Sequence, residues 1–262
     1  MTLALAHIEH PASEAETDPP LLIAHGLYGS GRNFNSLGKS LATNRRVVMV
    51  DMRNHGASPW DAEITYPAMA ADLASAARDL CGGQATVLGH SMGGKAAMAL
   101  ALSQPDLVAG LIVADIAPVA YDHGHEAYID AMQAVDLSAI TRRSDADPML
   151  AAAIPEKMLR AFLLQNLIVE GGVARWRLNL DALKRSLPTL LDWPAAWPHD
   201  GYDGPTLFLH GGASDYVTED MRPSIRGLFP RAEFETLAGA GHWLHAEQPQ
   251  DFLAAVARFL TD

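Results

Sequence analysis

The stretch from Ala85 to Leu102 constrains the fold more than any other part of this chain. Its first residues, 85–88, form an apolar run with the length of a buried strand, and residues 94–102 form an Ala-rich run typical of a buried helix. Between them stands Gly89-His90-Ser91-Met92-Gly93, a G-x-S-x-G pentapeptide. A strand that passes directly into a helix needs a strained turn, and flanking glycines remove side chains that would collide there. The pattern therefore predicts Ser91 at the tip of a sharp turn.

This turn predicts a nucleophilic role for the Ser91 hydroxyl. It would expose the hydroxyl and place the backbone N–H of Met92 at a helix N-terminus, where the N–H can stabilise developing negative charge. A glycine-rich turn with a solvent-facing serine is the simpler interpretation, because a five-residue pattern often occurs by chance. The strand before the turn and the Ala-rich helix after it favour the nucleophile.

Four further segments together with this one carry a resemblance to a known family. In chain order, the five are His25-Gly26-Leu27-Tyr28-Gly29-Ser30, Asp51-Met52-Arg53-Asn54-His55-Gly56, Gly89-His90-Ser91-Met92-Gly93-Gly94-Lys95, Asp115-Ile116-Ala117-Pro118 and Gly239-Ala240-Gly241-His242-Trp243. On these residues the chain resembles the α/β-hydrolase superfamily, and within it the small bacterial carboxylesterases and acyl-thioesterases. The resemblance implies an α/β fold with a mostly parallel sheet, helices on both faces, and a mainly helical cap inserted between the sixth and seventh core strands.

The alternation of apolar runs supports this architecture independently. Such runs predict strands at 3–8, 21–24, 46–51, 85–88, 111–116, 206–209 and 232–237. Between these runs the apolar residues recur at helical spacing, and an alternation of strands and helices favours a parallel sheet covered on both faces. The alternation stops after Pro118 and resumes at Gly204, and the residues between predict several helices and a small hairpin. We therefore expect a core domain of residues 1–117 and 204–262 and a cap, or lid, of residues 118–203.

A cap over the carboxyl ends of the strands would build an acyl pocket and exclude water. Met158, Phe162 and Trp176 are apolar candidates for lining that pocket. The same three side chains could equally form the cap's own core.

A serine hydroxyl needs a base to take its proton. His242 follows the last predicted strand in a glycine-rich turn, and the family order is serine, acid, histidine, so His242 is the predicted base. His245 is a weaker candidate, because it falls near the start of the final predicted helix. The resemblance also implies that Leu27, directly after His25-Gly26, supplies a second oxyanion N–H beside that of Met92.

Two carboxylates could orient the predicted base and stabilise its imidazolium form. Asp215 follows the penultimate predicted strand, the usual position of the acid in the superfamily. Asp115 lies at the end of the strand before that one, and the resembled subfamily places its acid in the Asp-Ile-Ala-Pro segment. We favour Asp115 and retain Asp215 as the alternative acid.

Together these residues predict a serine hydrolase that cleaves a small-molecule carboxylic ester or acyl thioester through an acyl-enzyme intermediate. No cofactor or metal is expected, because the His123-x-His125 pair lacks acidic or cysteine partners at ligand spacing. Carbon–carbon bond hydrolases and cofactor-free haloperoxidases or perhydrolases resemble this fold and use the same three residue types, so both remain alternatives. A non-enzymatic ligand receptor on a hydrolase fold is a further alternative.

The charge balance argues against two classes of partner. The chain has 19 Lys and Arg against 31 Asp and Glu, a net charge of −12, with no basic run, which disfavours nucleic acids and anionic membrane surfaces. A local basic patch could still bind an anionic ligand. No apolar run reaches the ~18 residues of a membrane span, and the one cysteine, Cys81, can form no intrachain disulfide. We expect a cytoplasmic protein without a membrane span; the sequence indicates no oligomeric state.

Overall fold

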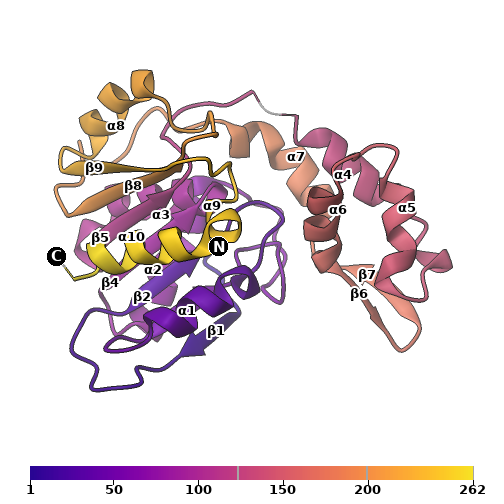
Figure 1. The fold of residues 1–262 in the computed structure, drawn as a ribbon, viewed down its shortest axis with the longest axis horizontal. Helices are drawn as coiled ribbons and strands as arrows, with labels where there is room; N and C mark the ends of the chain where they lie inside the picture. Colours follow the sequence, from indigo (N-terminus) through magenta and orange to yellow (C-terminus); the bar gives the residue numbers. More distant parts are fainter. Residues whose placement is uncertain (123, 199, 262) are drawn as a thin grey trace.

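The computed structural model describes residues 1–122, 124–198 and 200–261 (Figure 1). Its main sheet has seven strands in the order β1-β3-β2-β4-β5-β8-β9. Only β1 runs antiparallel to its neighbour, and all other neighbouring strands are parallel, as predicted. The strands are β1 (His7–His10), β2 (Leu21–Ala24), β3 (Val47–Val50), β4 (Ala85–His90), β5 (Val108–Ala114), β8 (Thr206–Gly211) and β9 (Ala232–Leu237).

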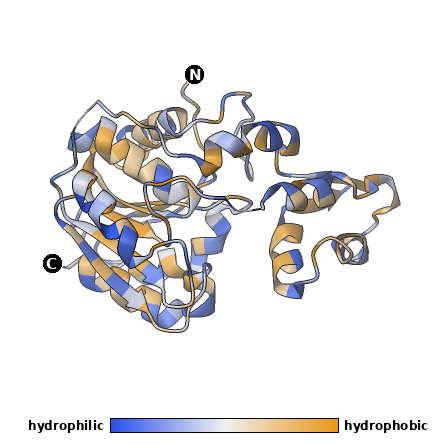
Figure 2. Ribbon diagram, turned by 90° about the horizontal axis from the view of Figure 1, so that it is seen from above, coloured by the Kyte–Doolittle hydropathy of each residue, from blue (hydrophilic) through white to orange (hydrophobic). Residues whose placement is uncertain are grey.

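Helices cover both faces of this sheet because its central strands are apolar on both sides. Along β2, Leu22 and Ala24 belong to the core that includes α2 and α3, whereas Leu21 and Ile23 belong to the core that includes α1 and α10. Figure 2 shows the hydrophobic residues concentrated in these strands and on the helix faces that meet them. The helices around the sheet are α1 (Asn35–Leu41), α2 (Tyr66–Leu80), α3 (Met92–Ser103), α8 (Arg222–Leu228), α9 (Leu244–Glu247) and α10 (Pro249–Phe259). In the described part of the chain, no helix is both long and apolar enough to cross a bilayer.

The first strand lies later in the chain than predicted, at His7–His10 instead of residues 3–8. The backbone N–H groups of Leu3 and Ala6 donate to side chains, Asp72 Oδ1 at 2.7 Å and Ser58 Oγ at 2.8 Å. Because these N–H groups are bound to side chains, the hydrogen bonds between the two strands, β1 and β3, end with the one that the N–H of Asp51 donates to the backbone oxygen of Ala6 at 2.8 Å.

Residues 118–203, which we call the insertion, lie to one side of the sheet in both views (Figures 1 and 2). They follow β5, the fifth strand, and precede β8, the sixth. The predicted position between the sixth and seventh core strands is one strand too late, because a single described strand, β1, precedes β2. The elements of the insertion are α4 (Glu126–Gln133), α5 (Asp147–Leu150), α6 (Lys157–Leu163), β6 (Leu167–Glu170), β7 (Val173–Trp176) and α7 (Leu180–Leu191).

The insertion contains the small hairpin that the sequence predicts, formed by antiparallel β6 and β7. It is joined to the loops that follow β2 and β3. Asn166 Nδ2 donates to the backbone oxygen of Tyr28 at 2.8 Å, and the backbone N–H of Asn179 donates to that of Asn54 at 3.1 Å. The insertion therefore contacts loops at the carboxyl ends of these strands, where parallel sheets bind ligands.

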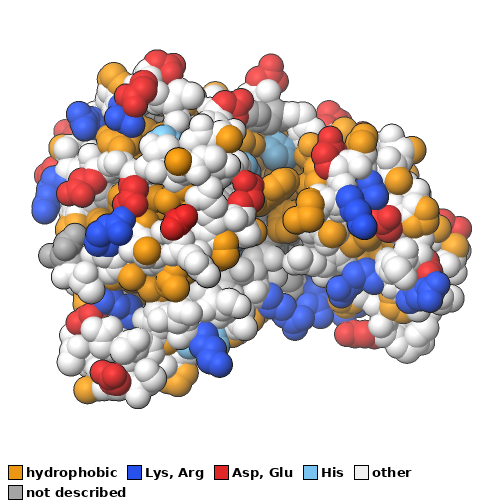
Figure 3. Space-filling view, viewed as in Figure 1, with side chains coloured by type: hydrophobic (Ala, Val, Ile, Leu, Met, Phe, Trp, Pro, Cys, Tyr) orange, Lys and Arg blue, Asp and Glu red, His pale blue; other side chains and the backbone are white. Residues whose placement is uncertain are grey.

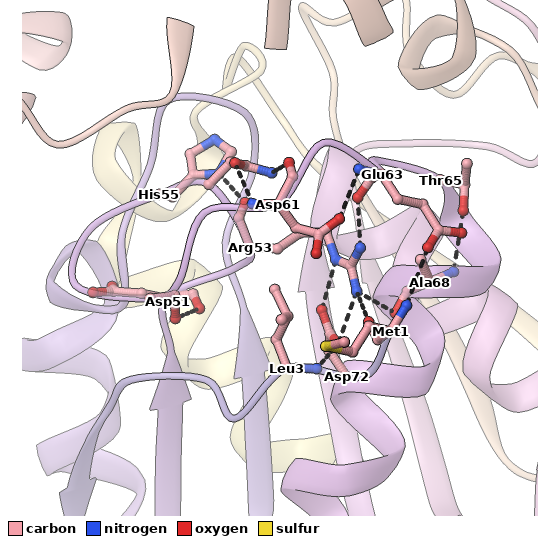
Figure 4. Close-up of polar contacts among 12 residues, drawn as sticks. Met1, Leu3, Asp51, Arg53, His55, Asp61, Glu63, Thr65, Ala68 and Asp72 are labelled. Carbon is pink, nitrogen blue, oxygen red and sulfur yellow. Dashed lines mark hydrogen bonds and ion pairs between the residues drawn. The ribbon is translucent and has the colours of Figure 1, made fainter. Parts of the chain in front are cut away.

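A buried ion pair fixes the loop after β3 (Figure 4). The Arg53 guanidinium donates from Nε to Asp72 Oδ2 at 2.7 Å and from Nη2 to Asp72 Oδ1 at 2.9 Å. Both side chains are almost fully buried, at 0% and 1% exposure. Arg53 also donates from Nη1 to the backbone oxygen of Glu63 and from Nη2 to that of Ala68. Because two nitrogens of Arg53 bind the two oxygens of one carboxylate, the pair holds this loop against α2.

We expect Asp72→Asn to lower the free energy of unfolding by about 3–5 kcal/mol, because it leaves a buried guanidinium without its carboxylate. Urea unfolding at constant pH measures the loss. Glu235→Gln is the matched control, since it breaks the half-exposed pair with Arg258 at an expected cost of about 0–1 kcal/mol. Equal losses in the two variants would contradict the assignment.

Candidate active site

The turn at Ser91 has the strained backbone that its sequence predicts. Ser91 lies between β4 and α3 with φ 53° and ψ −121°. Its N–H donates to the backbone oxygen of Ala114 at 3.0 Å. A Cβ at Gly89 would overlap the backbone of Gly93, and a Cβ at Gly93 would overlap the backbone of Ala24. Only glycine fits at these two positions, so the glycines allow the turn to pack tightly against the sheet.

Three predicted site residues lie in a hydrogen-bonded line. His242 Nε2 lies 3.1 Å from Ser91 Oγ, and His242 Nδ1 lies 2.7 Å from Asp115 Oδ2. Since an ionised carboxylate can only accept, Nδ1 carries the ring proton and Nε2 is left to accept the serine proton. His242 is 20% exposed and Asp115 is fully buried. This arrangement can move a proton from the hydroxyl to the imidazole.

Asp115 is held by more than its histidine partner. Its Oδ1 accepts from the backbone N–H of Gly211 at 3.0 Å, and its Oδ2 accepts from Ser214 Oγ at 2.5 Å. Asp215, the alternative acid, is exposed to solvent. Because both ring nitrogens of His242 already have partners, the geometry brings Asp115 and not Asp215 to the histidine.

The loop that carries His242 is fixed from two sides. His90 Nε2 donates to the backbone oxygen of His242 at 2.8 Å, and burial holds the pKa of His90 well below its usual value. On the other side, the ring of Tyr216 stacks on the imidazole, with centroids 3.8 Å apart and planes at 19°. These contacts restrict the rotation of the ring. His245, the weaker candidate for the base, is partly buried in a separate short helix, α9, where it stacks on Phe34.

The two predicted oxyanion residues lie beside the serine. Leu27 and Met92 both line a cavity that Ser91 also lines. Among the described residues, none accepts a hydrogen bond from the backbone N–H of Leu27 or Met92. Two unengaged donors next to a hydroxyl can stabilise an oxyanion that forms on a carbonyl carbon attacked by that hydroxyl.

Two buried histidines support the loop that carries Leu27. His25 donates from Nδ1 to the backbone oxygen of Gly26 at 2.8 Å and accepts at Nε2 from the N–H of Met52 at 2.9 Å. His55 donates from Nδ1 to Arg53 O at 2.8 Å and accepts at Nε2 from the N–H of Tyr28 at 3.2 Å. Burial lowers the pKa of His25 to about 4 and that of His55 to about 3. Both rings are therefore neutral and locked in one tautomer.

Two cavities meet at Ser91. The first is lined by His242, Trp243 and Phe162 among others, and the second by Met92, Lys95 and Tyr121 among others. Figure 3 shows hydrophobic and histidine side chains along the hollow between the sheet and the insertion.

Of the three apolar side chains predicted to line a pocket, Phe162 does so beside Ser91. Met158 does not, because it is 82% exposed. Trp176 is buried within the insertion and borders a different cavity, away from Ser91. In the predicted His123-x-His125 pair, His125 lines the first cavity and His123 lies outside the described residues.

Sequence reasoning missed Ser214, Tyr216 and Lys95. Ser214 and Tyr216 flank the alternative acid in the loop after β8, where the sequence pattern indicates only the carboxylate. The signal that could have found them was position, since a loop at the carboxyl end of a strand beside β5 must lie near Asp115. Lys95 was visible one helical turn after Ser91, which places it on the same side of α3.

Comparisons with known proteins identify the family of the chain. Residues 19–249 match the family model described as the alpha/beta hydrolase fold. The chain belongs to the α/β-hydrolase family. It is 45% identical to the sn-1-specific diacylglycerol lipase ABHD11 of Mus musculus over 252 residues, which cover 93% of this chain and 81% of the relative. It is 39% identical to the esterase YbfF of Escherichia coli over 254 residues, covering 96% of each.

A solved structure described as a marine microorganism esterase superposes with a TM-score of 0.91 at 37% sequence identity. The match covers 98% of this chain and all of that one. The similarity therefore includes the insertion as well as the sheet.

We expect His55→Asn to flatten the pH dependence of stability on the acid side. The pKa of His55 falls from 6.5 to about 3 on folding, so the unfolded chain binds one more proton between these values. The stability that depends on neutral His55 is fully present above about pH 6.5 and is lost toward pH 3, by up to about 1.4 kcal/mol per pH unit. Urea unfolding at several pH values between these limits measures the slope. Parallel profiles for the two proteins would contradict the neutral ring.

Proposed function

We propose that this chain is a carboxylic ester hydrolase in which Ser91, His242 and Asp115 form a catalytic triad. The observation that carries the proposal is the position of His242, whose two ring nitrogens lie within hydrogen-bond distance of a serine hydroxyl and a buried carboxylate. Relatives named as an esterase and a lipase, similar over nearly the whole chain, support ester cleavage. Acyl thioesters are a second substrate class that the same chemistry serves.

The reaction proceeds by acyl transfer in two steps. Ser91 Oγ attacks the carbonyl carbon while His242 Nε2 takes its proton, and Asp115 stabilises the resulting imidazolium. The N–H groups of Leu27 and Met92 hold the oxyanion. His242 then gives its proton to the leaving alcohol or thiol. In the second step it takes a proton from the water that attacks the acyl-enzyme, and returns that proton to Ser91 Oγ as the bond between Oγ and the acyl carbon breaks. The chain's own residues supply every group in this scheme.

Each of the two cavities that meet at Ser91 holds one part of the substrate. His242 lines the first cavity and not the second, and it must reach the leaving group to protonate it. The leaving group therefore occupies the first cavity, and the acyl group occupies the second. The insertion, residues 118–203, acts as a cap domain on the core of residues 1–117 and 204–262, because it supplies walls to both cavities and limits access of water.

Two other functions use the same arrangement. A carbon–carbon bond hydrolase or a perhydrolase needs a comparable triad, and a ligand receptor needs only the cavities. The names of the similar relatives favour ester cleavage over both. Repeated turnover of a simple p-nitrophenyl ester, without a peroxide or a diketone substrate, separates the three.

We expect Ser91→Ala to abolish both ester hydrolysis and covalent labelling by an organophosphonate, because it removes the only proposed nucleophile. Mass spectrometry of the intact protein measures the label, and a p-nitrophenyl ester assay measures turnover. Full esterase activity in this variant would end the proposal.

We expect Asp115→Asn to lower kcat by about 10⁴-fold, as loss of the triad carboxylate does in serine proteases. Asp215→Asn is the matched control, because its side chain is exposed in the same region, and we expect less than a threefold change. Steady-state kinetics on one ester at constant pH compares the two. A larger loss in Asp215→Asn would reverse the assignment of the acid.

A further inference from the structure

Lys95 is a buried cation beside the proposed nucleophile. It lies in the first turns of α3, and its backbone N–H donates to the backbone oxygen of Ser91 at 3.1 Å. The residue is only 1% exposed, and it lines the second cavity together with Ser91 and Met92. The proposed mechanism gives this ammonium no role.

The surroundings of Lys95 bind its side chain without supplying an opposite charge. Nζ donates to the backbone oxygens of Leu191 at 3.1 Å and Asp192 at 2.8 Å. It also lies 4.8 Å from the ring centroid of Tyr121 and 5.5 Å from that of Tyr66. Among the described residues, no carboxylate forms an ion pair with it. Burial lowers the pKa of Lys95 to about 7, against the smaller opposing effect of Asp192.

A buried ammonium without an ion-pair partner is costly, so its presence in a ligand cavity calls for an explanation. An ammonium has three N–H donors, and backbone oxygens take two of them here. The walls of the cavity are otherwise mainly apolar or aromatic, including Leu27, Ile116 and Leu190. Lys95 is thus the one lysine or arginine among the residues that line this cavity, and in its protonated form it complements an anion.

The second cavity is the acyl side of the proposed site, because it contains the two oxyanion residues and not His242. Its volume is about 30 Å³, which suits a chain of only a few atoms beyond the carbonyl. A short acyl group that starts at Ser91 would therefore reach Lys95 with its far end.

We propose that Lys95 recognises a carboxylate at the far end of a short acyl group, so that the preferred substrates are half-esters or half-thioesters of short dicarboxylic acids. The inference rests on the proposed function and narrows its substrate class. The carboxylate would take the third Nζ proton and supply the charge that the described residues do not. Lys95 is then the residue that sets acyl specificity.

A purely structural role for Lys95 predicts a different result. The two carbonyls that it binds lie at the end of α7, so the side chain also ties the insertion to α3. Loss of such a tie would impair all substrates alike. The experiment must therefore measure a ratio between two substrates and not a single rate.

The matched substrates are monoethyl malonate and ethyl 3-methylbutanoate, in which an isopropyl group replaces the carboxylate. Their hydrolysis is followed by titration of released acid at constant pH. A hydrogen bond to a charged group is worth about 1.5–3 kcal/mol, so we expect kcat/KM of the wild-type protein to favour the half-ester by about 10- to 100-fold. In Lys95→Met, which removes the charge and keeps an unbranched side chain, this ratio should fall at least about tenfold.

Lys184→Met is the matched control, because Lys184 lies in α7 and pairs with Asp130 on the surface of the insertion. It should leave the ratio of the two substrates unchanged. A second measurement needs no variant at Lys95: malonate should inhibit the wild-type protein about tenfold more strongly than 3-methylbutanoate does. This comparison keeps the proposal falsifiable if Lys95→Met does not fold.

Three results would overturn the proposal. An equal loss of kcat/KM on both substrates in Lys95→Met would show that Lys95 only holds the insertion against α3. A wild-type preference for the neutral ester, with activity lost in Ser91→Ala, would remove the carboxylate specificity and leave the proposed hydrolase intact. Hydrolysis of neither ester, nor of p-nitrophenyl esters, would remove the proposed function as well.

Discussion

The backbone turn at Ser91 is the constraint on which the rest of the site depends. A non-glycine residue at positive φ costs free energy, and it persists only where the surrounding structure holds it. Here the sheet on one side and α3 on the other hold it, and Gly89 and Gly93 allow the close approach. The other non-glycine residues at positive φ, Tyr28, Asn54 and Asp115, also follow strands of the same sheet. Strain is thus concentrated at the carboxyl ends of β2, β3, β4 and β5, where the site lies.

A layer of buried polar groups behind the site supports these strained loops. His25 and His55 each connect two backbone segments through a neutral ring, and Arg53 joins the loop after β3 to α2 through Asp72. Because each of these groups has its hydrogen-bonding partners inside the protein, their burial is tolerated. This layer positions Leu27, and it presents no charged side chain to the substrate cavity. The lysine that lines a cavity beside Ser91 is Lys95.

Sequence patterns predicted the sheet well because strand and helix alternate with clear periodicity. All seven strands of the sheet were predicted, and the hairpin of the insertion as well. The start of β1 was missed because its competing partners, Asp72 and Ser58, are remote in sequence. The sequence also left two candidates for the acid that orients His242. The choice between Asp115 and Asp215 depends on which side chain points inward, and this again is set by contacts remote in sequence. Met158 was predicted to line the pocket because it is apolar, but it lies on the outer surface. Helical spacing alone does not say which face of α6 meets the core.

The three residues of the proposed triad are far apart in the chain. Ser91 and His242 are separated by 151 positions, and Asp115 and His242 by 127. A chain emerging from a ribosome would therefore display the serine turn long before its imidazole exists. During that interval the hydroxyl is an ordinary alcohol, so on the proposed mechanism a nascent or C-terminally clipped polypeptide would not cleave esters. The proposed nucleophile would become reactive only when the segment after β9, which carries His242, packs beside it, so that completion of the fold would itself activate the chemistry.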